Sequence, residues 1–400
     1  MIERNRYIRK LIPFMDKGLI KVITGIRRSG KSSLIAQLIE VLKSKGVDKQ
    51  QIIHINMELM AFDNLKNYQD FYAYIKQIQN NSSEKIYLFV DEVQEIEGWE
   101  KAINSFLAEG KYDIYITGSN AKLLSGELAS LLSGRYVEFK MFTLVYNEFL
   151  QFRDQKASKS EFNLFLKYGG FPGIHHMILD DVISKQYLQA IHNSVILKDV
   201  IIRNKIRDVA LLDVVSKYLI DNCGNITSAK GISDYMKSQK RSVTVDTVLN
   251  YIRYMCDAML FEKVQRYDIK GKRLLETYEK YYMMDIGISY ANLGFTPEKI
   301  PGLLENIVLL ELKSRDYEVC IGKINELEID FIATKGNDKL YIQVCTTLNN
   351  ENVIEREYKS LSLVGDNFPK YVLSLDEGFN TSKNGIKWMN LQDFLLWDGY

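Results

Sequence analysis

The sequence of 400 residues has only four cysteines, and no two of them form a C-x-x-C pair. Scattered cysteines argue against a disulfide scaffold and a cysteine zinc site, and they suit a reducing compartment. No apolar run approaches the roughly 20 residues that a membrane-spanning helix needs, and Met1–Arg6 contain no apolar signal region. The formal net charge of +1 indicates no polyanionic partner. We therefore expect a cytoplasmic protein without a membrane partner.

Residues Gly25–Ser32 read GIRRSGKS and match G-x-x-x-x-G-K-[ST], the phosphate-binding P-loop. A strand-like apolar run, 19–24, precedes the motif, and a helical pattern over 33–42 follows it. In this context the N–H groups of the loop cradle phosphates at a helix N-terminus, while Lys31 reaches the β- and γ-phosphates and the Ser32 hydroxyl binds Mg²⁺. The residues expected to bind nucleotide are Gly25, Arg28, Ser29, Gly30, Lys31, Ser32 and Ser33.

A second nucleotide signal is KIYLFVDE at 85–92, an apolar run that ends in two carboxylates. The carboxyl end of a buried parallel strand faces the ligand crevice. We expect Asp91 to contribute to the Mg²⁺ site and Glu92 to act as the general base toward water. An acidic helix start is the alternative, and the P-loop in the same segment disfavours it.

A third strand-like run, 112–117, is followed by Gly118-Ser119-Asn120. Either Asn120 or Ser119 would lie beside the γ-phosphate, where it would orient water or sense the phosphate. Both residue types also favour a helix N-cap, and the two roles are compatible. We expect Asn120 to take part in catalysis.

An arginine finger is a further expectation. Arg135 follows Gly134 and precedes the strand-like run at 136–139, so it is a candidate finger within the chain or across a subunit. Arg27 and Arg28, inside the loop, compete for phosphate contact. No N-K-x-D guanine-reading motif follows the acidic strand, so ATP is the expected nucleotide.

Strands alternate with helices through the first 150 residues, and a further strand is expected at 51–56. This alternation predicts an α/β fold, a P-loop parallel sheet with helices on both faces at 1–150. A helical lid or linker is expected at 151–205, where the loop YGGFPG at 168–173 marks an enforced turn. A winged helix-turn-helix at 206–290 and a smaller α/β domain at 291–400 complete the expected organisation.

Several segments together resemble a known family. GIRRSGKSS, YLFVDEVQ, ITGSNAKLL, LLSGRYVEF and YGGFPGI are similar to segments of prokaryotic AAA-type P-loop ATPases with a C-terminal domain of unknown function, which has a degenerate restriction-nuclease-like fold. The resemblance covers nearly the whole chain and implies an ATPase that uses ATP and Mg²⁺. AAA-type sites often form between subunits, so a homo-oligomer is one expected state and a monomer the other. The nucleotide-handling positions implied are Lys31, Ser32, Asp91, Glu92, Asn120 and Arg135.

Residues 208–285 show three helical patterns and then a hairpin, which is the order of a winged helix-turn-helix. Cations precede the third helix, lie on its polar face and occupy the hairpin turn. We expect non-specific contacts with DNA phosphates, while RNA, a protein partner or a lid role are alternatives. A slow nucleotide switch that regulates DNA binding is the alternative to an ATPase. The candidate contacts are Lys237, Lys240, Arg241, Arg253, Lys270, Lys272 and Arg273.

The last hundred residues resemble the PD-(D/E)xK nuclease core. Glu305 lies in a helical pattern, and Asp330 and Gln343 lie at matching positions of two strand-like runs. In such a core these three side chains hold Mg²⁺ and a nearby lysine activates water. Cys345 stands where that lysine belongs, and a neutral thiol cannot stabilise developing charge. We expect a vestigial metal site and an inherited fold without cleavage, with an ATP-gated nuclease as the disfavoured alternative.

Overall fold

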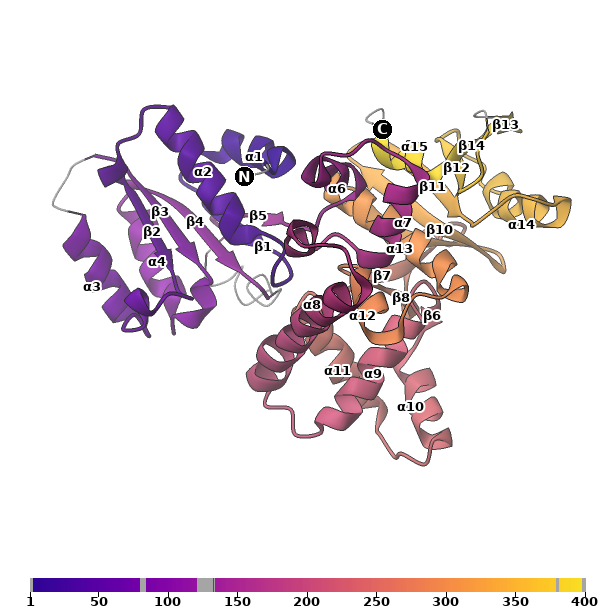
Figure 1. The fold of residues 1–400 in the computed structure, drawn as a ribbon, viewed down its shortest axis with the longest axis horizontal. Helices are drawn as coiled ribbons and strands as arrows, with labels where there is room; N and C mark the ends of the chain where they lie inside the picture. The colour runs from indigo at the N-terminus through magenta and orange to yellow at the C-terminus, as the bar shows by residue number, and fades with distance from the viewer. Residues whose placement is uncertain (1–2, 80–83, 121–131, 133, 379–380, 398–400) are drawn as a thin grey trace. The chain divides into compact units, whose positions relative to one another are not determined.

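A computed structural model describes residues 3–79, 84–120, 132, 134–378 and 381–397 (Figure 1). The chain divides into two compact units. The first unit runs to Met141 and the second begins at Phe142, except that Asp257–Met259 group with the first unit. Among the residues that the structure describes, no helix is long and apolar enough to cross a membrane.

The first unit is an α/β unit built on a parallel sheet. Its described strands follow the order β2-β3-β4-β1-β5, and every neighbouring pair is parallel. The strands expected at 19–24, 51–56, 112–117 and 136–139, and the strand-like run expected at 85–92, are confirmed to within a residue. Its helices and strands are α1 (Asn5–Leu11), β1 (Ile20–Thr24), α2 (Lys31–Ser44), β2 (Ile52–Asn56), α3 (Tyr68–Ile78), β3 (Ile86–Asp91), α4 (Trp99–Ala108), β4 (Tyr112–Gly118) and β5 (Tyr136–Lys140).

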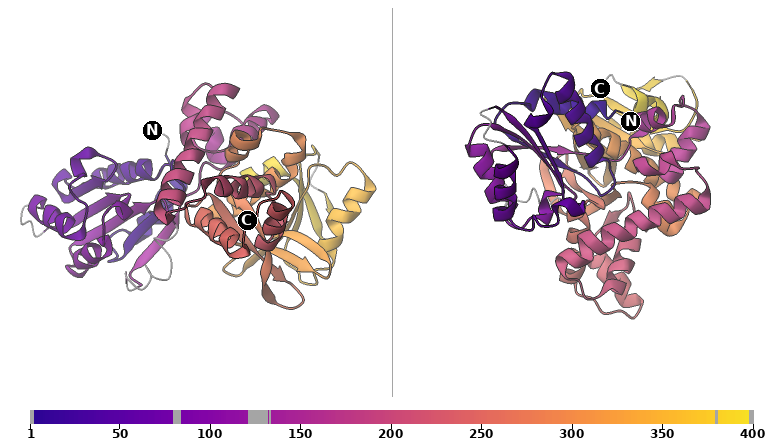
Figure 2. Two further views of the ribbon diagram at one scale, coloured as in Figure 1. Left: turned by 90° about the horizontal axis from the view of Figure 1, so that it is seen from below. Right: turned by 60° about the vertical axis from the view of Figure 1, so that its left-hand side comes forward.

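Helices cover both faces of this sheet (Figures 1 and 2). Successive side chains of a strand point to opposite faces, so β3 contributes to two apolar layers. Leu88 and Val90 pack with residues of α3 and α4, while Phe89 packs with residues of α1 and α2. Because both faces are covered, β1, β3 and β4 are buried along their whole length. The predicted parallel sheet with helices on both faces is confirmed.

The second unit starts with helices and continues into a mixed sheet. A π-helical segment, Val195–Ile202, extends α8. The elements up to the hairpin are α6 (Tyr146–Arg153), α7 (Lys159–Tyr168), α8 (Asp181–Ser194), α9 (Val209–Asp221), β6 (Ile226–Thr227), α10 (Ala229–Ser238), α11 (Val245–Asp257), β7 (Phe261–Asp268) and β8 (Arg273–Met283). The remaining elements are α12 (Gly287–Leu293), α13 (Ile300–Ser314), β9 (Glu318–Ile324), β10 (Leu327–Lys335), β11 (Asp338–Val344), α14 (Glu351–Ser362), β12 (Lys370–Ser374), β13 (Ser382–Lys383), β14 (Ile386–Asn390) and α15 (Leu391–Leu396).

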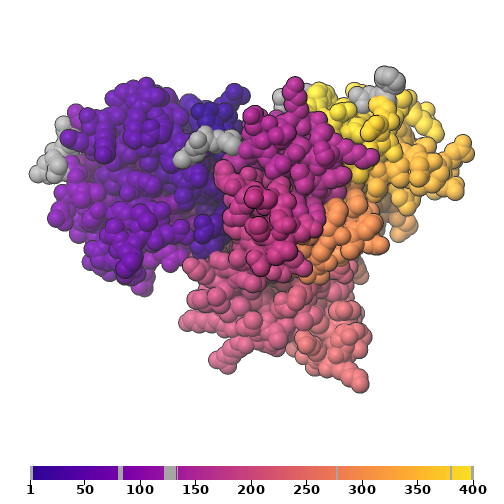
Figure 3. All heavy atoms as spheres, viewed as in Figure 1, coloured from indigo at the N-terminus to yellow at the C-terminus, as the bar shows by residue number. Residues whose placement is uncertain are grey.

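A single sheet runs through the second unit. Among the described strands its order is β13-β14-β12-β11-β10-β9-β7-β8-β6, with β7 and β9 paired in parallel. The segments predicted at 206–290 and 291–400 therefore share this sheet. The helices α9, α10 and α11 lie toward one end of the unit, and the chain from β12 to α15 lies toward the other (Figure 3). The three helices α9, α10 and α11 and the β7–β8 hairpin follow one another as expected, while the short strand β6 between α9 and α10 was not expected. The winged-helix interpretation of this order stays a prediction.

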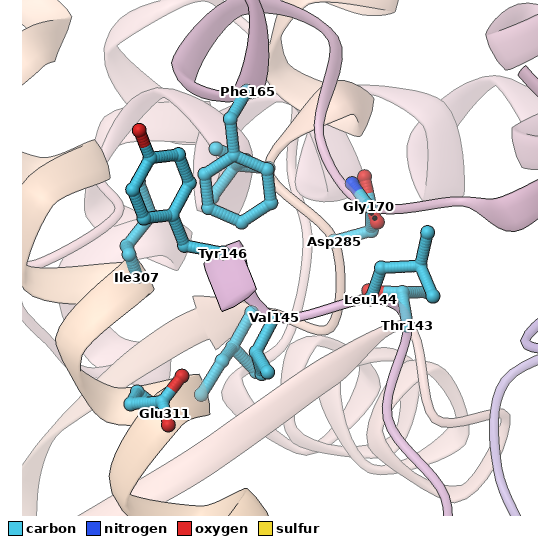
Figure 4. Close-up of a pocket in the computed structure, with 11 residues that line it drawn as sticks. Thr143, Leu144, Val145, Tyr146, Phe165, Gly170, Asp285, Ile307 and Glu311 are labelled. Carbon is cyan, nitrogen blue, oxygen red and sulfur yellow. Dashed lines mark hydrogen bonds between the residues drawn. The ribbon is translucent and has the colours of Figure 1, made fainter. Parts of the chain in front are cut away.

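The loop YGGFPG is held against a buried carboxylate. Asp285 accepts hydrogen bonds from the N–H groups of Gly170, at 2.9 Å, and Gly287, at 2.8 Å. A Cβ atom on Gly170 would lie 2.1 Å from the carbonyl oxygen of Leu144, so a side chain is excluded there. Figure 4 shows Asp285 and Gly170 together beside a cavity of about 10 Å³, which is the space that one water occupies. The glycines of this motif thus allow its backbone to pack closely against neighbouring backbone in the second unit.

Candidate nucleotide site

The P-loop connects β1 to α2 at the carboxyl edge of the first sheet. The backbone of Met141 passes close to Gly25. A Cβ atom at position 25 would lie 2.4 Å from the carbonyl oxygen of Met141, so this position requires glycine. Gly30 is the N-cap of α2 and has φ 101°, a left-handed conformation that glycine adopts without strain. The loop between β1 and α2 therefore has a backbone conformation that needs glycine at positions 25 and 30.

Lys31 lies buried at the start of α2 and points back over the loop. Its ammonium donates to the carbonyl oxygens of Gly25, at 3.0 Å, and Ile26, at 3.4 Å. The same Nζ lies 3.5 Å from Oε1 of Glu92. The lysine of the P-loop and the carboxylate at the end of β3 are thus neighbours in space, although 60 residues separate them in the sequence.

The other loop residues differ in exposure. Arg28 is exposed and has φ 70°, while Ser32 and Ser33 are exposed on the first turn of α2. Ser29 is fully buried, and its hydroxyl has no hydrogen-bond partner among the described residues. Exposed hydroxyls at a helix N-terminus are accessible to a phosphate and its cation.

Thr117 of β4 ties the two carboxylates of β3 together. Its hydroxyl donates to Oδ1 of Asp91 and accepts a hydrogen bond from the N–H of Glu92 at 3.0 Å. Asp91 is 1% exposed, and its second oxygen, Oδ2, is buried without a hydrogen-bond partner in the described part of the chain. A buried carboxylate oxygen that lacks a partner is costly, unless a ligand supplies one.

Glu92 is buried among partners that favour its charge. Burial by itself raises its pKa, but the Lys31 ammonium, the Gln94 amide, Arg27 and the Ser119 hydroxyl outweigh burial, so the pKa of Glu92 lies below its ordinary value. Ser119 donates to Oε2 at 3.1 Å, and Gln94 donates to the same oxygen. Glu92 is therefore ionised at neutral pH.

The site fits Mg²⁺ by the chemistry of its donors. Mg²⁺ prefers oxygen ligands and binds through one or two carboxylates together with phosphates. The buried Oδ2 of Asp91 lacks a partner among the described residues, and the hydroxyl of Ser32 is exposed at the start of α2. Asp91 and Ser32 are the residues that would hold the cation.

The two remaining predicted residues, Asn120 and Arg135, lie at different edges of the first sheet. Asn120 follows β4 and is 2% exposed, at the same edge of the sheet as the P-loop. Arg135 lies at the opposite edge, because its carbonyl oxygen accepts the N–H of Ile20 at the start of β1. Five residues of strand, about 16 Å, separate Arg135 from the Lys140 end of β5. The described structure does not bring Arg135 to the P-loop, and its role as an arginine finger, within the chain or across a subunit, stays a prediction.

The sequence alone did not indicate three residues of the site. Thr117 and Gln94 hold Asp91 and Glu92, as described above. Arg4 is 2% exposed, and its guanidinium donates to the carbonyl oxygen of Ser29 at 3.2 Å. The backbone N–H of Arg4 donates to the side-chain amide oxygen of Gln37 at 2.9 Å. No local pattern marks Arg4, because the contact depends on how α1 packs against α2.

The candidate nucleic-acid contacts of the second unit are all exposed. Lys240 and Lys272 have positive φ, as turn residues do. Lys237 pairs with Asp234 at 3.3 Å, and Arg253 donates to the amide oxygen of Asn250 at 3.1 Å. These cations are accessible to a polyanion, and their role stays a prediction.

Comparisons with known proteins match this arrangement. A family model described as an AAA domain matches residues 17–150, and a model described as a domain of unknown function, DUF8612, matches residues 159–299. An uncharacterized protein of Haemophilus influenzae is 37% identical over 400 residues, which are 99% of this chain and 99% of that protein. The chain belongs to an AAA-type P-loop ATPase family. The AAA match contains Lys31, Asp91 and Glu92, so the candidate site lies in the domain that defines this ATPase family.

The comparisons also give a second relative of this ATPase-family chain and two solved structures. An uncharacterized protein of Methanocaldococcus jannaschii is 33% identical over 396 residues, which cover 92% of this chain and 84% of that protein. Among solved structures, the Walker-type ATPase of Pyrococcus abyssi has a TM-score of 0.41 at 16% identity and covers 73% of this chain and 96% of its own. The Orc1 protein of Aeropyrum pernix in complex with DNA has a TM-score of 0.33 at 10% identity, with 73% and 92% covered.

Proposed function

We propose that this protein binds ATP with Mg²⁺ in its first unit and hydrolyses it. The observation that carries the proposal is the ionised Glu92 beside Lys31, at the edge of the sheet where the P-loop begins. A lysine that neutralises phosphate charge and a carboxylate that accepts a proton are the two groups that hydrolysis requires of the protein.

Each residue has a distinct task in the proposed reaction. The N–H groups of the loop and Lys31 hold the phosphates, and Glu92 accepts the proton of the attacking water. Ser119 and Gln94 fix the direction of the Glu92 carboxylate, and Asn120 contacts the γ-phosphate or the water. Mg²⁺, when bound by Asp91 and Ser32, supplies positive charge to the phosphate oxygens. Catalysis of this kind consists of positioning and electrostatic stabilisation.

The Lys31→Ala variant tests the phosphate-binding part of this proposal. The substitution removes the buried ammonium that we expect to contact the phosphates. Both the affinity for ATP and the rate of phosphate release should therefore fall. Lys43→Ala, on the exposed side of the same helix, is the matched control and should leave both unchanged. Full nucleotide affinity and turnover in Lys31→Ala would refute the proposal.

We further propose that nucleotide state controls the binding of DNA, or of a protein, through the second unit. The exposed cations around α10, α11 and the β7–β8 turn support a phosphate-binding surface. Each lost phosphate contact should reduce the slope of log affinity against log salt by about 1.

The test uses anisotropy of a labelled DNA duplex over a range of salt concentrations. The variant combines Lys270→Ala, Lys272→Ala and Arg273→Ala, and the control carries the same number of charge losses at the exposed Lys359, Lys383 and Lys387. The variant should bind more weakly with a smaller slope, and the control should match the wild type. Equal affinity and slope in all three proteins would turn the search to a protein partner.

A further inference from the structure

A buried lysine occupies the centre of the predicted vestigial nuclease site. Lys280 of β8 is 2% exposed. Its ammonium lies 2.7 Å from Oε1 of Glu328, 3.1 Å from Oε2 of Glu305 and 3.9 Å from Oδ1 of Asp330. We call these four residues the Lys280 cluster. One ammonium thus faces carboxylates from α13 and β10, two elements far from β8 in the sequence.

The carboxylates of the cluster are held in place by further hydrogen bonds. The hydroxyl of Tyr282 donates to Oε2 of Glu305 at 2.9 Å, and the N–H of Val344 donates to Oδ2 of Asp330 at 2.7 Å. The amide oxygen of Gln343 accepts the N–H of Asp330 at 3.4 Å. Glu305, Asp330 and Gln343, which the sequence places in one site, do lie around one point of the second unit.

The charges of the cluster are unbalanced. Three carboxyl groups face a single ammonium, so the ionised cluster carries an excess of negative charge. Burial raises the pKa of Asp330 well above its ordinary value, and the neighbouring Glu305 carboxylate raises it further. Burial likewise raises the pKa of Glu305, against the opposing effect of Lys280. The raised pKa values mean that the cluster takes up a proton more readily, which offsets part of this excess.

The cluster borders on a cavity of about 260 Å³ with polar walls. Glu305 forms part of its lining, and the other lining residues include Asp221, Gly224, Ser289 and Glu298. Gly224 leaves room beside the carboxylate, because a Cβ atom there would lie 3.2 Å from Oε2 of Glu305. A hydrated cation has space in this cavity to approach Glu305, the member of the cluster that lines it.

We propose that Glu305, Glu328 and Asp330 form a cation site that the Lys280 ammonium fills, and that a divalent cation binds there only when this ammonium is removed. Carboxylates from separate elements are the ligands that Mg²⁺, Mn²⁺ and Ca²⁺ prefer, and a lysine ammonium is a compact point charge. In the described part of the chain, no group of three or more His, Cys, Asp or Glu side chains has the arrangement of a metal site.

The proposal accounts for the cysteine at the position of the nuclease lysine. Burial raises the pKa of Cys345 to about 12, and nearby carboxylates contribute, so the thiol carries no charge near neutral pH. The positive charge comes instead from Lys280, on a different strand, and it takes the place of the metal. Metal-dependent cleavage is therefore blocked in the wild-type protein. This inference does not depend on ATP hydrolysis.

The Lys280→Gln variant tests the proposal, with Lys280→Arg as the control that keeps the charge. Thermal unfolding of the full chain is followed in EDTA and in MnCl₂, and bound Mn²⁺ is measured by electron paramagnetic resonance. We expect Lys280→Gln to unfold earlier in EDTA, to gain several degrees in MnCl₂ and to bind Mn²⁺. Wild type and Lys280→Arg should show neither response at this site. Adding Asp330→Asn to Lys280→Gln should abolish the gain and so separates this site from the P-loop.

Three results would overturn the proposal. The first is Mn²⁺ binding by the wild type that Asp330→Asn removes, because it would show that Lys280 does not fill the site. The second is a folded Lys280→Gln protein whose unfolding and Mn²⁺ binding match the wild type. The third is a Lys280→Gln chain that fails to fold in EDTA and also in MnCl₂, because the metal should supply the missing charge.

Discussion

Thr117→Val is the substitution that probes the core of the candidate site most sharply. Thr117 is fully buried, and its hydroxyl both donates to Asp91 and accepts the N–H of Glu92. Valine has nearly the same shape, so the change creates no cavity and removes only the two hydrogen bonds. Its effect therefore measures how much the hydroxyl contributes to holding the two carboxylates of β3.

The magnitude follows from what the substitution leaves behind. An oxygen of Asp91 and the N–H of Glu92 would remain buried without a partner, and each such group costs about 1 to 3 kcal/mol. We expect the free energy of opening of β3 and β4 to fall by about 2 to 6 kcal/mol. ATP turnover should fall as well, because Asp91 and Glu92 would lose their fixed positions.

Hydrogen exchange of β3 and β4 peptides measures this free energy locally. Thr24→Val is the matched control on β1, where the buried hydroxyl donates to Oε1 of Glu138 at 2.8 Å. Glu138 is exposed, so water can replace the lost bond, and we expect a loss of only about 0.5 to 1.5 kcal/mol. A loss from Thr117→Val no larger than that of the control would refute the reasoning.

Three further predictions follow from single contacts. Gly25→Ala should abolish binding of a fluorescent ATP analogue, because its Cβ would lie 2.4 Å from the carbonyl oxygen of Met141, and binding at wild-type affinity would contradict this. Burial raises the pKa of Asp285 from 3.8 to about 7, so the folded protein binds the proton more tightly than the unfolded chain and this group's contribution to stability should fall between about pH 4 and pH 7. Urea unfolding over that range should show the advantage of wild type over Asp285→Asn shrinking as pH rises, and a constant difference would contradict it. Asp208→Ala should lower stability by about 1 kcal/mol in the same assay, since its carboxylate caps α9 by accepting the N–H of Leu211 at 2.9 Å, and an unchanged midpoint would contradict the cap.

The geometry of the candidate nucleotide site could be anticipated because its parts are local patterns. GIRRSGKS carries both the glycines and the lysine, and the apolar run before Asp91 and Glu92 marks a buried strand. Since parallel strands end at one edge of a sheet, the sequence suffices to bring these segments together. The same rule sets Arg135 apart from these segments. It precedes its strand, and the start of a parallel strand lies at the edge away from the ligand.

Contacts between distant side chains could not be predicted. Lys21 interrupts the apolar strand β1 and pairs with Asp113 of β4, and neither residue signals the other in the sequence. Lys280 likewise stands in an ordinary strand of mixed residues, while the sequence pattern directed attention to Cys345. Both lysines acquire their partners only through sheet pairing and helix packing. Tertiary contacts therefore decide where these charges are buried.

The central claim, hydrolysis of ATP with Glu92 as the base, is tested most directly by phosphate release from Glu92→Gln. The amide keeps the shape of the side chain but cannot accept the proton, so turnover should fall by about 10²- to 10⁴-fold while ATP still binds. Glu95→Gln, an exposed neighbour in the next turn, should hydrolyse ATP like the wild type. Glu92→Gln that turns over ATP at the wild-type rate would contradict the account.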